Sequence, residues 1–264
     1  MTSPLASPRT VPGPDDRRFR TVILDFYGTL GHATHWLGID AVLAEHGYEF
    51  PDEVRRRWWF ESEEDGMDHA EHSADATAYE QWQRNRILGM LADCDVHPGE
   101  YEVIVDKLRS GKSTRVLEPY PESAPVLAEL RARGLQLAVC SNWDWDLAEA
   151  IDEVGLTGAT DVVVSSAWAG ARKPHPRIYE HTLAATGADP EHTLFVGDTW
   201  GPDVIGPRTR GMTPLYLLRV DHWADPTAPD EPAAEAMCAN DLTALLTLTD
   251  LTLTETFVDR TELT

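Results

Sequence analysis

Basic residues are scarce in this sequence. Lys and Arg number 22 against 45 Asp and Glu, which gives a formal net charge of −23. A field of that sign repels phosphate backbones and anionic lipids, so the composition argues against nucleic-acid and membrane-surface partners. The hydrophobic fraction of 42% and the charged fraction of 25% are ordinary for a globular protein.

Cysteines and long apolar runs are also few. The three cysteines, Cys94, Cys140 and Cys238, are too sparse for a disulfide framework. No segment approaches the roughly 18 consecutive apolar residues that a membrane-spanning helix requires. Residues 1–20 are rich in Pro, Ser and Arg and lack an apolar stretch, so we expect a disordered leader rather than a signal peptide or anchor. The expected location is the cytoplasm.

Short apolar runs alternate with helix-period segments along most of the chain. The runs predict buried strands at residues 21–24, 136–140, 161–164, 193–196 and 214–218. Helices are predicted between them at residues 122–133, 144–154 and 176–186. Asp144 is the expected cap of the second helix, and Pro176 and Gly187 bracket the third. This alternation predicts an α/β fold, a Rossmann-like parallel sheet with helices on both faces.

One stretch interrupts the alternation. Residues 33–113 show helical patterns and no convincing strand, and they are rich in aromatic side chains such as Trp58, Trp59, Tyr79 and Trp82. We interpret them as a helical domain inserted into a core formed by residues 21–32 and 114–248. The aromatics either pack the helices together or line a substrate pocket. The Thr-rich tail, residues 249–264, carries no chemistry that we can interpret.

Polar side chains follow several predicted strands. Asp25 follows the first strand, and Gly28 permits a sharp turn after it. Near another strand end, Gly197-Asp198 is followed by Asp203, five residues after Asp198. Open parallel sheets bind ligands at this edge. Several carboxylates there would form a hard, oxygen-rich site that suits Mg²⁺.

Two further loops supply complementary groups. Ser141 ends a predicted strand and is followed by Asn142, where a hydroxyl and backbone N–H groups can bind an anion. Lys173 precedes a proline-started helix, and its ammonium could neutralise both a carboxylate and a phosphate. Taken alone, each of these residues could equally be an ordinary turn, cap or surface residue.

In this order along the chain, the four loops resemble the haloacid dehalogenase-like superfamily. Its signatures are an Asp-x-Asp-Gly-Thr-like run, a Ser or Thr, a Lys, and a Gly-Asp-x-x-x-x-Asp-like run; the resemblance covers residues 21–218. It implies that residues 33–113 are the helical cap that this superfamily inserts after the first strand. It also implies a Mg²⁺-dependent phosphatase that acts on a small phosphorylated molecule through an aspartyl-phosphate. A homodimer is compatible with it, but the sequence leaves the oligomeric state open.

The resemblance also assigns roles residue by residue. Asp25 would be the nucleophile, Lys173 the charge-neutralising group and Ser141 a phosphate hydrogen-bond donor. Substrate-binding positions would be Ser141, Asn142, Thr29 and Gly28. Metal ligands would be Asp25, the backbone carbonyl of Tyr27, Asp198 and Asp203.

Tyr27 departs from the phosphatase pattern, which usually has an aspartate two residues after the nucleophile. A phenol can donate a proton but is a poor base at neutral pH. His32 or His35 could lend a base, although we expect exposed histidines there. His69 and His72 are also expected to be solvated.

Two other functions stay open. The Asp-x-Tyr-Gly-Thr-Leu run also looks like that of the metal-independent 2-haloacid dehalogenases, which Ser141, Asn142, Lys173 and Tyr179 fit as well. Asp198 argues against that enzyme, and the halide-binding arginine it needs could only be guessed among Arg55, Arg56 and Arg57. The third reading is a phosphate-binding protein whose turnover is impaired by Tyr27.

Overall fold

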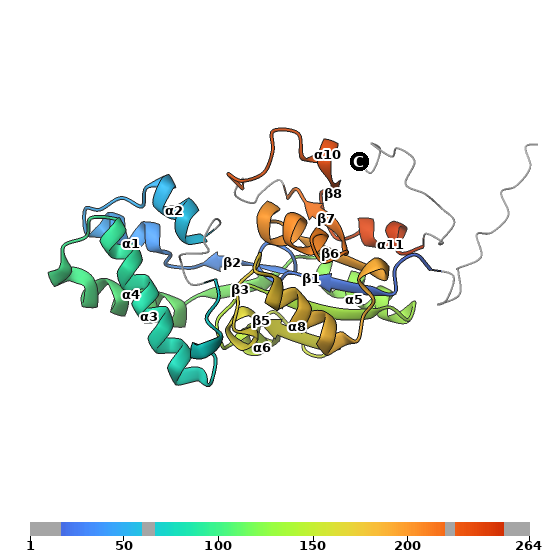
Figure 1. Ribbon diagram of the computed structural model, residues 1–264, viewed down its shortest axis with the longest axis horizontal. Helices are drawn as coiled ribbons and strands as arrows, with labels where there is room; N and C mark the ends of the chain where they lie inside the picture. Colours follow the sequence, from blue (N-terminus) through green and yellow to red (C-terminus); the bar gives the residue numbers. More distant parts are fainter. Residues whose placement is uncertain (1–16, 60–66, 220–224, 251–264) are drawn as a thin grey trace, which may run out of the picture.

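The computed structural model describes residues 17–59, 67–219 and 225–250 (Figure 1). Most of the expected leader and tail therefore lies outside the described residues. Residues 17–20 are an exception, because Phe19 is fully buried in the core. The expectation of a disordered leader is wrong for these four residues. The sequence does not indicate their burial, because a single aromatic residue among charged neighbours forms no strand or helix pattern. None of the described helices has the length and hydropathy to cross a bilayer.

A parallel sheet forms the centre of the molecule. In the part of the chain that the structure describes, its six strands follow the order β5-β4-β1-β6-β7-β8. The strands are β1 (Thr21–Leu24), β4 (Gln136–Ser141), β5 (Val162–Ser165), β6 (Thr193–Gly197), β7 (Thr213–Leu217) and β8 (Met237–Ala239). β1 lies between β4 and β6, with Ile23 opposite both Ala138 and Phe195. The predicted parallel α/β fold is confirmed, and of the six strands of this sheet β8 was not predicted.

Alternating side chains of the strands build two apolar cores. On one face, Leu24, Val139 and Val196 pack with α5 (Ser123–Ala132), α6 (Leu147–Glu153) and α11 (Ala244–Leu248). On the other face, Ile23, Cys140 and Phe195 pack with α7 (Ser166–Ala169) and α8 (Pro176–Thr186). Both faces are buried, which explains why the strands are continuous apolar runs.

The helix signals in the core are mostly accurate. α8 has the predicted bounds, and Gly187 ends it in the left-handed region with φ of 67°. The predicted cap role of Asp144 is wrong: α6 begins at Leu147, and the Asp144 carboxylate accepts hydrogen bonds from Tyr79 and Lys112 instead. Short helices α9 (Gly206–Arg208) and α10 (Pro232–Glu235) complete the C-terminal half.

The helices between β2 and β3 form a separate layer beside the sheet (Figure 1). They are α1 (Ile39–Glu45), α2 (Asp52–Trp59), α3 (Ala76–Asp93) and α4 (Tyr101–Ser113). They have their own apolar cluster, which includes Leu43, Leu91 and Ile104. Trp58 and Trp59 pack against this cluster, whereas Trp36 packs against Tyr27 and Trp143 of the core. Phe60 lies outside the described residues.

A two-stranded antiparallel ribbon joins this helical layer to the core. β2 (Gly31–His35) pairs with β3 (Val116–Pro119), with Gly31 opposite Pro119. The expectation that no strand occurs in residues 33–113 is therefore wrong at its first residues. β2 is partly exposed and its sequence is Gly-His-Ala-Thr-His, so it lacks the apolar alternation that signals a strand.

Candidate active site

Asp25 lies at the carboxyl end of the central strand β1. Its backbone N–H continues the sheet by donating to the Val196 carbonyl at 2.8 Å, and the residue is buried. The chain then turns tightly, because the Phe26 carbonyl accepts from the N–H groups of Leu30 at 2.8 Å and Gly31 at 3.0 Å. Gly28 adopts φ of 79° in this turn, which a side chain would disfavour. Strand and turn together fix the carboxylate at the edge of the sheet.

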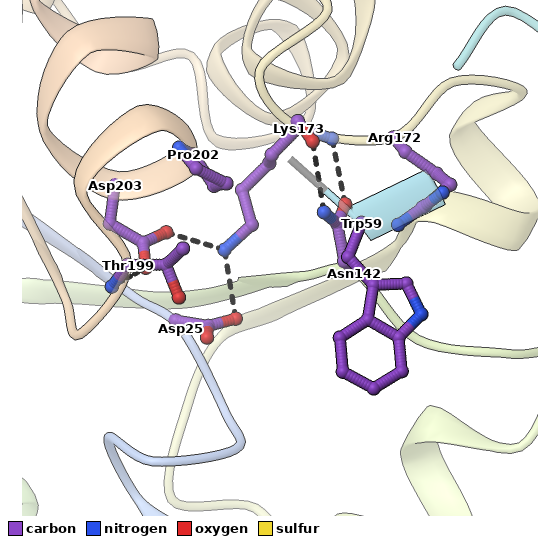
Figure 2. Close-up of a pocket in the computed structure, with 8 residues that line it drawn as sticks. All are labelled: Asp25, Trp59, Asn142, Arg172, Lys173, Thr199, Pro202 and Asp203. Atoms are coloured by element: carbon purple, nitrogen blue, oxygen red, sulfur yellow. Dashed lines mark hydrogen bonds and ion pairs between the residues drawn. The ribbon is translucent and has the colours of Figure 1, made fainter. Parts of the chain in front are cut away.

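Lys173 is the cation at the centre of the site. Its Nζ lies 2.8 Å from Asp25 Oδ1 and 2.6 Å from Asp203 Oδ1, and its side chain is almost fully buried (Figure 2). Asn142 fixes the lysine backbone, since its Nδ2 donates to the Lys173 carbonyl at 2.9 Å and its Oδ1 accepts the Lys173 N–H at 2.7 Å. The Asn142 side chain lines the pocket, and both its Nδ2 and its Oδ1 form hydrogen bonds to the backbone of this loop.

Three buried carboxylates converge here. One oxygen from each of Asp25, Asp198 and Asp203 lies within 4.8 Å of the others. Asp203 has no exposed surface, and its Oδ2 accepts the Thr199 N–H at 2.9 Å. Close packing requires glycine at position 197, because a Cβ there would lie 2.3 Å from Asp203 Cγ. β6 and the helical turn after it therefore bring Asp198 and Asp203 to Asp25.

The cluster carries more negative charge than its lysine balances. Burial raises the pKa of Asp203 to about 8; Lys173 opposes this shift, whereas Asp25 and Asp198 add to it. Burial alone would lower the pKa of Lys173, but Asp203 and Asp25 outweigh it and raise that pKa. With all three carboxylates ionised the cluster has a net charge of −2. A divalent cation would compensate this charge, and an all-oxygen donor set suits Mg²⁺.

A small pocket opens beside these groups. Its volume is about 160 Å³, and it is lined by Asp25, Trp59, Asn142, Arg172, Lys173, Thr199, Pro202 and Asp203 (Figure 2). Four of these, Trp59, Arg172, Thr199 and Pro202, were not singled out as site residues in the sequence. Arg172 is the notable omission, because an arginine before a lysine is not a specific signal. Trp59 was named only among the aromatics that either pack the helices or line a pocket, and it does line this pocket.

Other predicted site residues lie behind this pocket. Ser141 ends β4 and is buried, and Thr29 has no exposed surface; neither lines the pocket. Gly28 and Thr29 are bound through their carbonyls, which accept from Arg219 Nε at 2.9 Å and from its Nη2 at 2.7 Å. Arg219, directly beyond β7, was missed because the sequence pattern weakens after it. Substrate contacts by Ser141, Gly28 and Thr29 stay predictions.

Tyr27 lies in an aromatic cluster. Its ring packs edge-on against Trp36 at 5.6 Å and lies 6.3 Å from Trp143. Burial raises the pKa of Tyr27; a backbone hydrogen bond at Ala33 opposes the shift, and Asp198 adds to it. The phenol is therefore protonated at neutral pH and cannot act as a base. Metal binding by its backbone carbonyl stays a prediction.

The structure confirms some of the expectations for the histidines and contradicts others. His69 is 1% exposed and packs against Trp82 at 4.2 Å, so the expectation that it is solvated is wrong; His72 is exposed as expected. No sequence pattern predicts the aromatic contacts of His69, because Tyr79 and Trp82 reach it only when α3 folds beside it. His32 is partly buried and stacks on Tyr120 at 4.7 Å, while His35 is exposed.

The arginines considered for a halide site do not line the pocket. Arg55 forms an ion pair with Asp40, and its guanidinium lies 5.1 Å from the Trp59 ring centroid. Arg57 pairs with Asp93 at 3.2 Å. Neither they nor Arg56 belongs to the pocket lining.

Comparisons with known proteins identify the family of this chain. A family model, haloacid dehalogenase-like hydrolase, matches residues 19–208. The phosphoserine phosphatase of Thermus thermophilus is 39% identical over 113 residues, 42% of this chain and 45% of that protein. The chain thus spans about half the length of the curated relatives it matches.

Solved structures share the fold. A predicted phosphoglycolate phosphatase from Haemophilus somnus superposes with a TM-score of 0.63 at 16% identity, covering 88% of this chain and 98% of that one. The L-2-haloacid dehalogenase of Xanthobacter autotrophicus gives a TM-score of 0.56 at 25% identity, covering 87% and 98%. Because the family model spans most of the chain, from the residues before β1 to those after Asp203, this protein belongs to the haloacid dehalogenase-like hydrolases.

Proposed function

We propose that this protein is a Mg²⁺-dependent phosphatase that hydrolyses a small phosphomonoester through an aspartyl-phosphate on Asp25. The observation that carries the proposal is the convergence of Asp25, Asp198 and Asp203 with Lys173 at one pocket. A divalent cation would offset the net charge of −2 on this cluster, and the site could then accept a phosphoryl group. The phosphatase name of the Thermus thermophilus relative supports the same chemistry.

Asp25 would act as the nucleophile. Its buried carboxylate attacks phosphorus, the bond from phosphorus to the ester oxygen breaks, and the leaving oxygen takes the electron pair and a proton from water. Water then attacks the phosphorus of the aspartyl-phosphate, the bond to Asp25 breaks, and phosphate leaves. The proton that this water loses balances the one taken by the leaving group, so one water is consumed per ester.

Lys173 and Asp203 would prepare the nucleophile. The ammonium, 2.8 Å from Asp25 Oδ1, would orient that carboxylate and lies where it can also face the transferred phosphoryl group. Asp203, 2.6 Å from the same ammonium, holds it in place. Asp25, Asp198, Asp203 and the Tyr27 carbonyl would hold Mg²⁺. When bound, the ion offsets the carboxylate charge and polarises the phosphoryl oxygens.

The layer α1–α4 would be the cap that selects the substrate. Trp59 at the end of α2 lines the pocket beside the core residues, which supports this role. Closure over the site would keep bulk water from the reacting groups. We place the protein in the cytoplasm as part of this proposal.

The direct test is phosphate release from p-nitrophenyl phosphate. We expect turnover with Mg²⁺, loss of turnover with EDTA, and a loss of at least about 1,000-fold in Asp25→Asn, because a neutral amide cannot form the acyl phosphate. Asp106→Asn, an exposed acid on α4, is the matched control and should leave the rate unchanged. Turnover that survives both EDTA and Asp25→Asn would refute the mechanism.

The same proteins separate the two alternatives. EDTA-insensitive halide release from 2-chloropropionate would identify a dehalogenase, which the excess negative charge of the site argues against. Tight binding of Mg²⁺ and phosphate without turnover of either substrate would identify a binding protein.

A further inference from the structure

The loop that carries Lys173 is held from two sides. On the core side, Asn142 binds both the N–H and the carbonyl of Lys173 (Figure 2). On the other side lies a segment of the helical layer, residues 67–73, which precedes α3 and which we call the strap. It contacts residues 170–173, which we call the lysine loop. The chemistry proposed above gives the strap no role.

The strap and the lysine loop share backbone hydrogen bonds. Asp68 and Ala171 lie opposite each other in an antiparallel bridge, which contains two hydrogen bonds of 2.9 and 2.8 Å. These bonds join the His69 N–H to the Gly170 carbonyl and the Arg172 N–H to the Met67 carbonyl. Ala171 has no exposed surface and lies two residues before Lys173. The bridge therefore fixes the backbone from which the lysine side chain extends.

Gly170 allows the two backbones to approach each other closely. It adopts φ of 72°, and a Cβ at this position would lie 2.7 Å from Ala70 Cα. The atom that such a Cβ would meet belongs to the backbone, so the strap could yield only by moving as a whole. A residue without a side chain is thus required for the strap to lie directly on the lysine loop.

An ion pair joins the strap to the start of α8. The Asp68 carboxylate accepts from Arg177 Nη1 at 2.6 Å and from its Nη2 at 3.1 Å, which is a bidentate arrangement. Arg177 Nη1 also donates to the Gly170 carbonyl at 3.4 Å. Both side chains are about half exposed, so the pair contributes little to global stability. Its effect is local, because it connects the strap, the lysine loop and α8 at one point.

The strap is also anchored to α3. The His69 ring lies 4.2 Å from the Trp82 ring and 5.6 Å from the Tyr79 ring, and its Nδ1 lies 3.1 Å from Ser73 Oγ. His69 is buried. The helical layer is thereby connected to the lysine loop through α3, the strap and the backbone bridge.

We infer that the strap holds Lys173 in place for phosphoryl transfer and that Asp68 and Arg177 are positioning residues of this reaction. With the lysine loop fixed, the ammonium stays 2.8 Å from Asp25 Oδ1 and faces the charge that develops on the transferred phosphoryl group. Loss of the strap contacts should therefore lower kcat and leave substrate binding intact. The inference rests on the proposed phosphatase function, because it assigns how the lysine of that mechanism is positioned.

Steady-state kinetics with p-nitrophenyl phosphate and Mg²⁺ test the ion pair. Asp68→Ala should lower kcat by about 10-fold and change KM by less than about threefold, since a displacement of about 1 Å can cost up to about 100-fold in rate. Arg177→Ala should give the same loss. The double variant should lose no more than either single variant, because the two side chains form one link. Glu180→Ala removes another ion pair of α8, with Arg210 at 2.8 Å, and should keep the wild-type kcat.

Gly170→Ala tests the backbone contact. Gly187→Ala is the matched control, because Gly187 has φ of 67° but nothing within 4 Å of an added Cβ. Both variants strain the backbone, whereas only Gly170→Ala displaces the strap, so only this variant should lose about 10-fold or more in kcat at unchanged KM. Thermal unfolding checks that each variant is folded at the assay temperature. If Gly170→Ala is unfolded there, the ion-pair variants decide the question alone.

Orthovanadate separates positioning of Lys173 from a purely structural effect, because it adopts the trigonal-bipyramidal geometry of phosphoryl transfer. Its inhibition constant should rise in Asp68→Ala in proportion to the loss of kcat/KM, whereas the inhibition constant of inorganic phosphate should change by less than about threefold.

Three results would overturn the inference: a wild-type kcat in both Asp68→Ala and Gly170→Ala, a rise in KM at unchanged kcat, or losses that add up in the double variant. The phosphatase proposal is judged separately. If the wild type turns over p-nitrophenyl phosphate with Mg²⁺ and Asp25→Asn does not, that proposal stands and only the role of the strap falls. If the wild type shows no turnover, both fall.

Discussion

Arg219 stabilises the turn after Asp25, although Arg219 lies more than 190 residues further along the chain. Besides the Gly28 and Thr29 carbonyls, its guanidinium binds Glu122 at 2.8 Å and covers the Tyr120 ring at 3.4 Å, with only 8% of its side chain exposed. The two carbonyls belong to the segment that includes the predicted Tyr27 ligand. Arg219 is therefore a positioning residue for the nucleophile turn.

Replacing Arg219 by Lys should expose this role. A lysine keeps the charge but carries its donors on one nitrogen, so it cannot span the positions of Nε, Nη1 and Nη2, and we expect kcat/KM to fall by roughly 10- to 100-fold. The Mg²⁺-induced rise in melting temperature should shrink as well. Glu122→Gln is the control: it weakens the ion pair and stability but leaves both carbonyl contacts, so activity per folded molecule should persist. Wild-type kinetics and Mg²⁺ response in Arg219→Lys would contradict the assignment.

At the scale of elements, the joint between β6 and the helical turn after it decides whether the site forms. A Cβ at Gly197 would lie 2.3 Å from Asp203 Cγ, whereas a Cβ at Gly201 would meet nothing within 4 Å. Gly197→Ala should therefore displace Asp203 from Lys173, lower the unfolding free energy by about 1–3 kcal/mol and abolish phosphatase activity. Gly201→Ala should stay within about 0.5 kcal/mol of the wild type. Urea unfolding and p-nitrophenyl phosphate turnover measure both effects.

Asp144 connects the helical layer to the core. Its carboxylate accepts from the Tyr79 hydroxyl at 3.0 Å and from Gln83 Nε2 at 3.4 Å, both on α3, and pairs with Lys112 of α4 at 2.7 Å. It lies two residues after Asn142, so this contact reaches the loop that holds Lys173. The sequence predicts a helix cap at Asp144, because a sequence does not distinguish an aspartate that caps a helix from one that forms an ion pair with a distant residue.

Asp144→Ala should loosen this connection. We expect faster amide hydrogen exchange in α3 and α4 than in β1 or β6, and a loss of about 1 kcal/mol in unfolding free energy. Asp106→Asn, on the exposed face of α4, should leave exchange unchanged. Uniform acceleration over the whole chain would instead indicate only global destabilisation.

The elements that sequence reasoning predicted share one property: their signal is local. β1 and α8 have the predicted bounds because one is a continuous apolar run and the other is bracketed by Pro176 and Gly187. Asp25, Asp198 and Asp203 follow from strand ends, which parallel pairing brings to one edge. The ribbon β2–β3, the buried His69 and the Arg219 contacts depend on partners far away in the chain, and no short pattern predicts them.

At the scale of the whole molecule, buried His69 makes folding sensitive to acid. Burial and the nearby Arg172 lower its pKa from 6.5 to about 4. The groups facing it are Tyr79 and Trp82 of α3, Ser73, whose Oγ lies 3.1 Å from its Nδ1, and the charged Asp68, Arg86 and Arg172. The folded state therefore excludes the imidazolium that the unfolded chain accepts freely.

The sign of the pH effect follows from proton counting. Between pH 6.5 and about pH 4 the unfolded chain binds more protons at this histidine than the folded protein, so the free energy of unfolding falls as the pH falls. The stabilisation is fully present above pH 6.5, and the shift corresponds to at most about 3 kcal/mol.

Urea unfolding of the wild type and of His69→Gln at several pH values isolates this contribution. The wild type should lose up to about 3 kcal/mol more than the variant between pH 6.5 and pH 4, because all other titrating groups are common to both. His181→Gln, an exposed histidine on α8, should follow the wild-type curve. If the wild type and His69→Gln lose stability in parallel, then the helical layer opens around His69 before the chain unfolds, and the imidazole is protonated in the native ensemble.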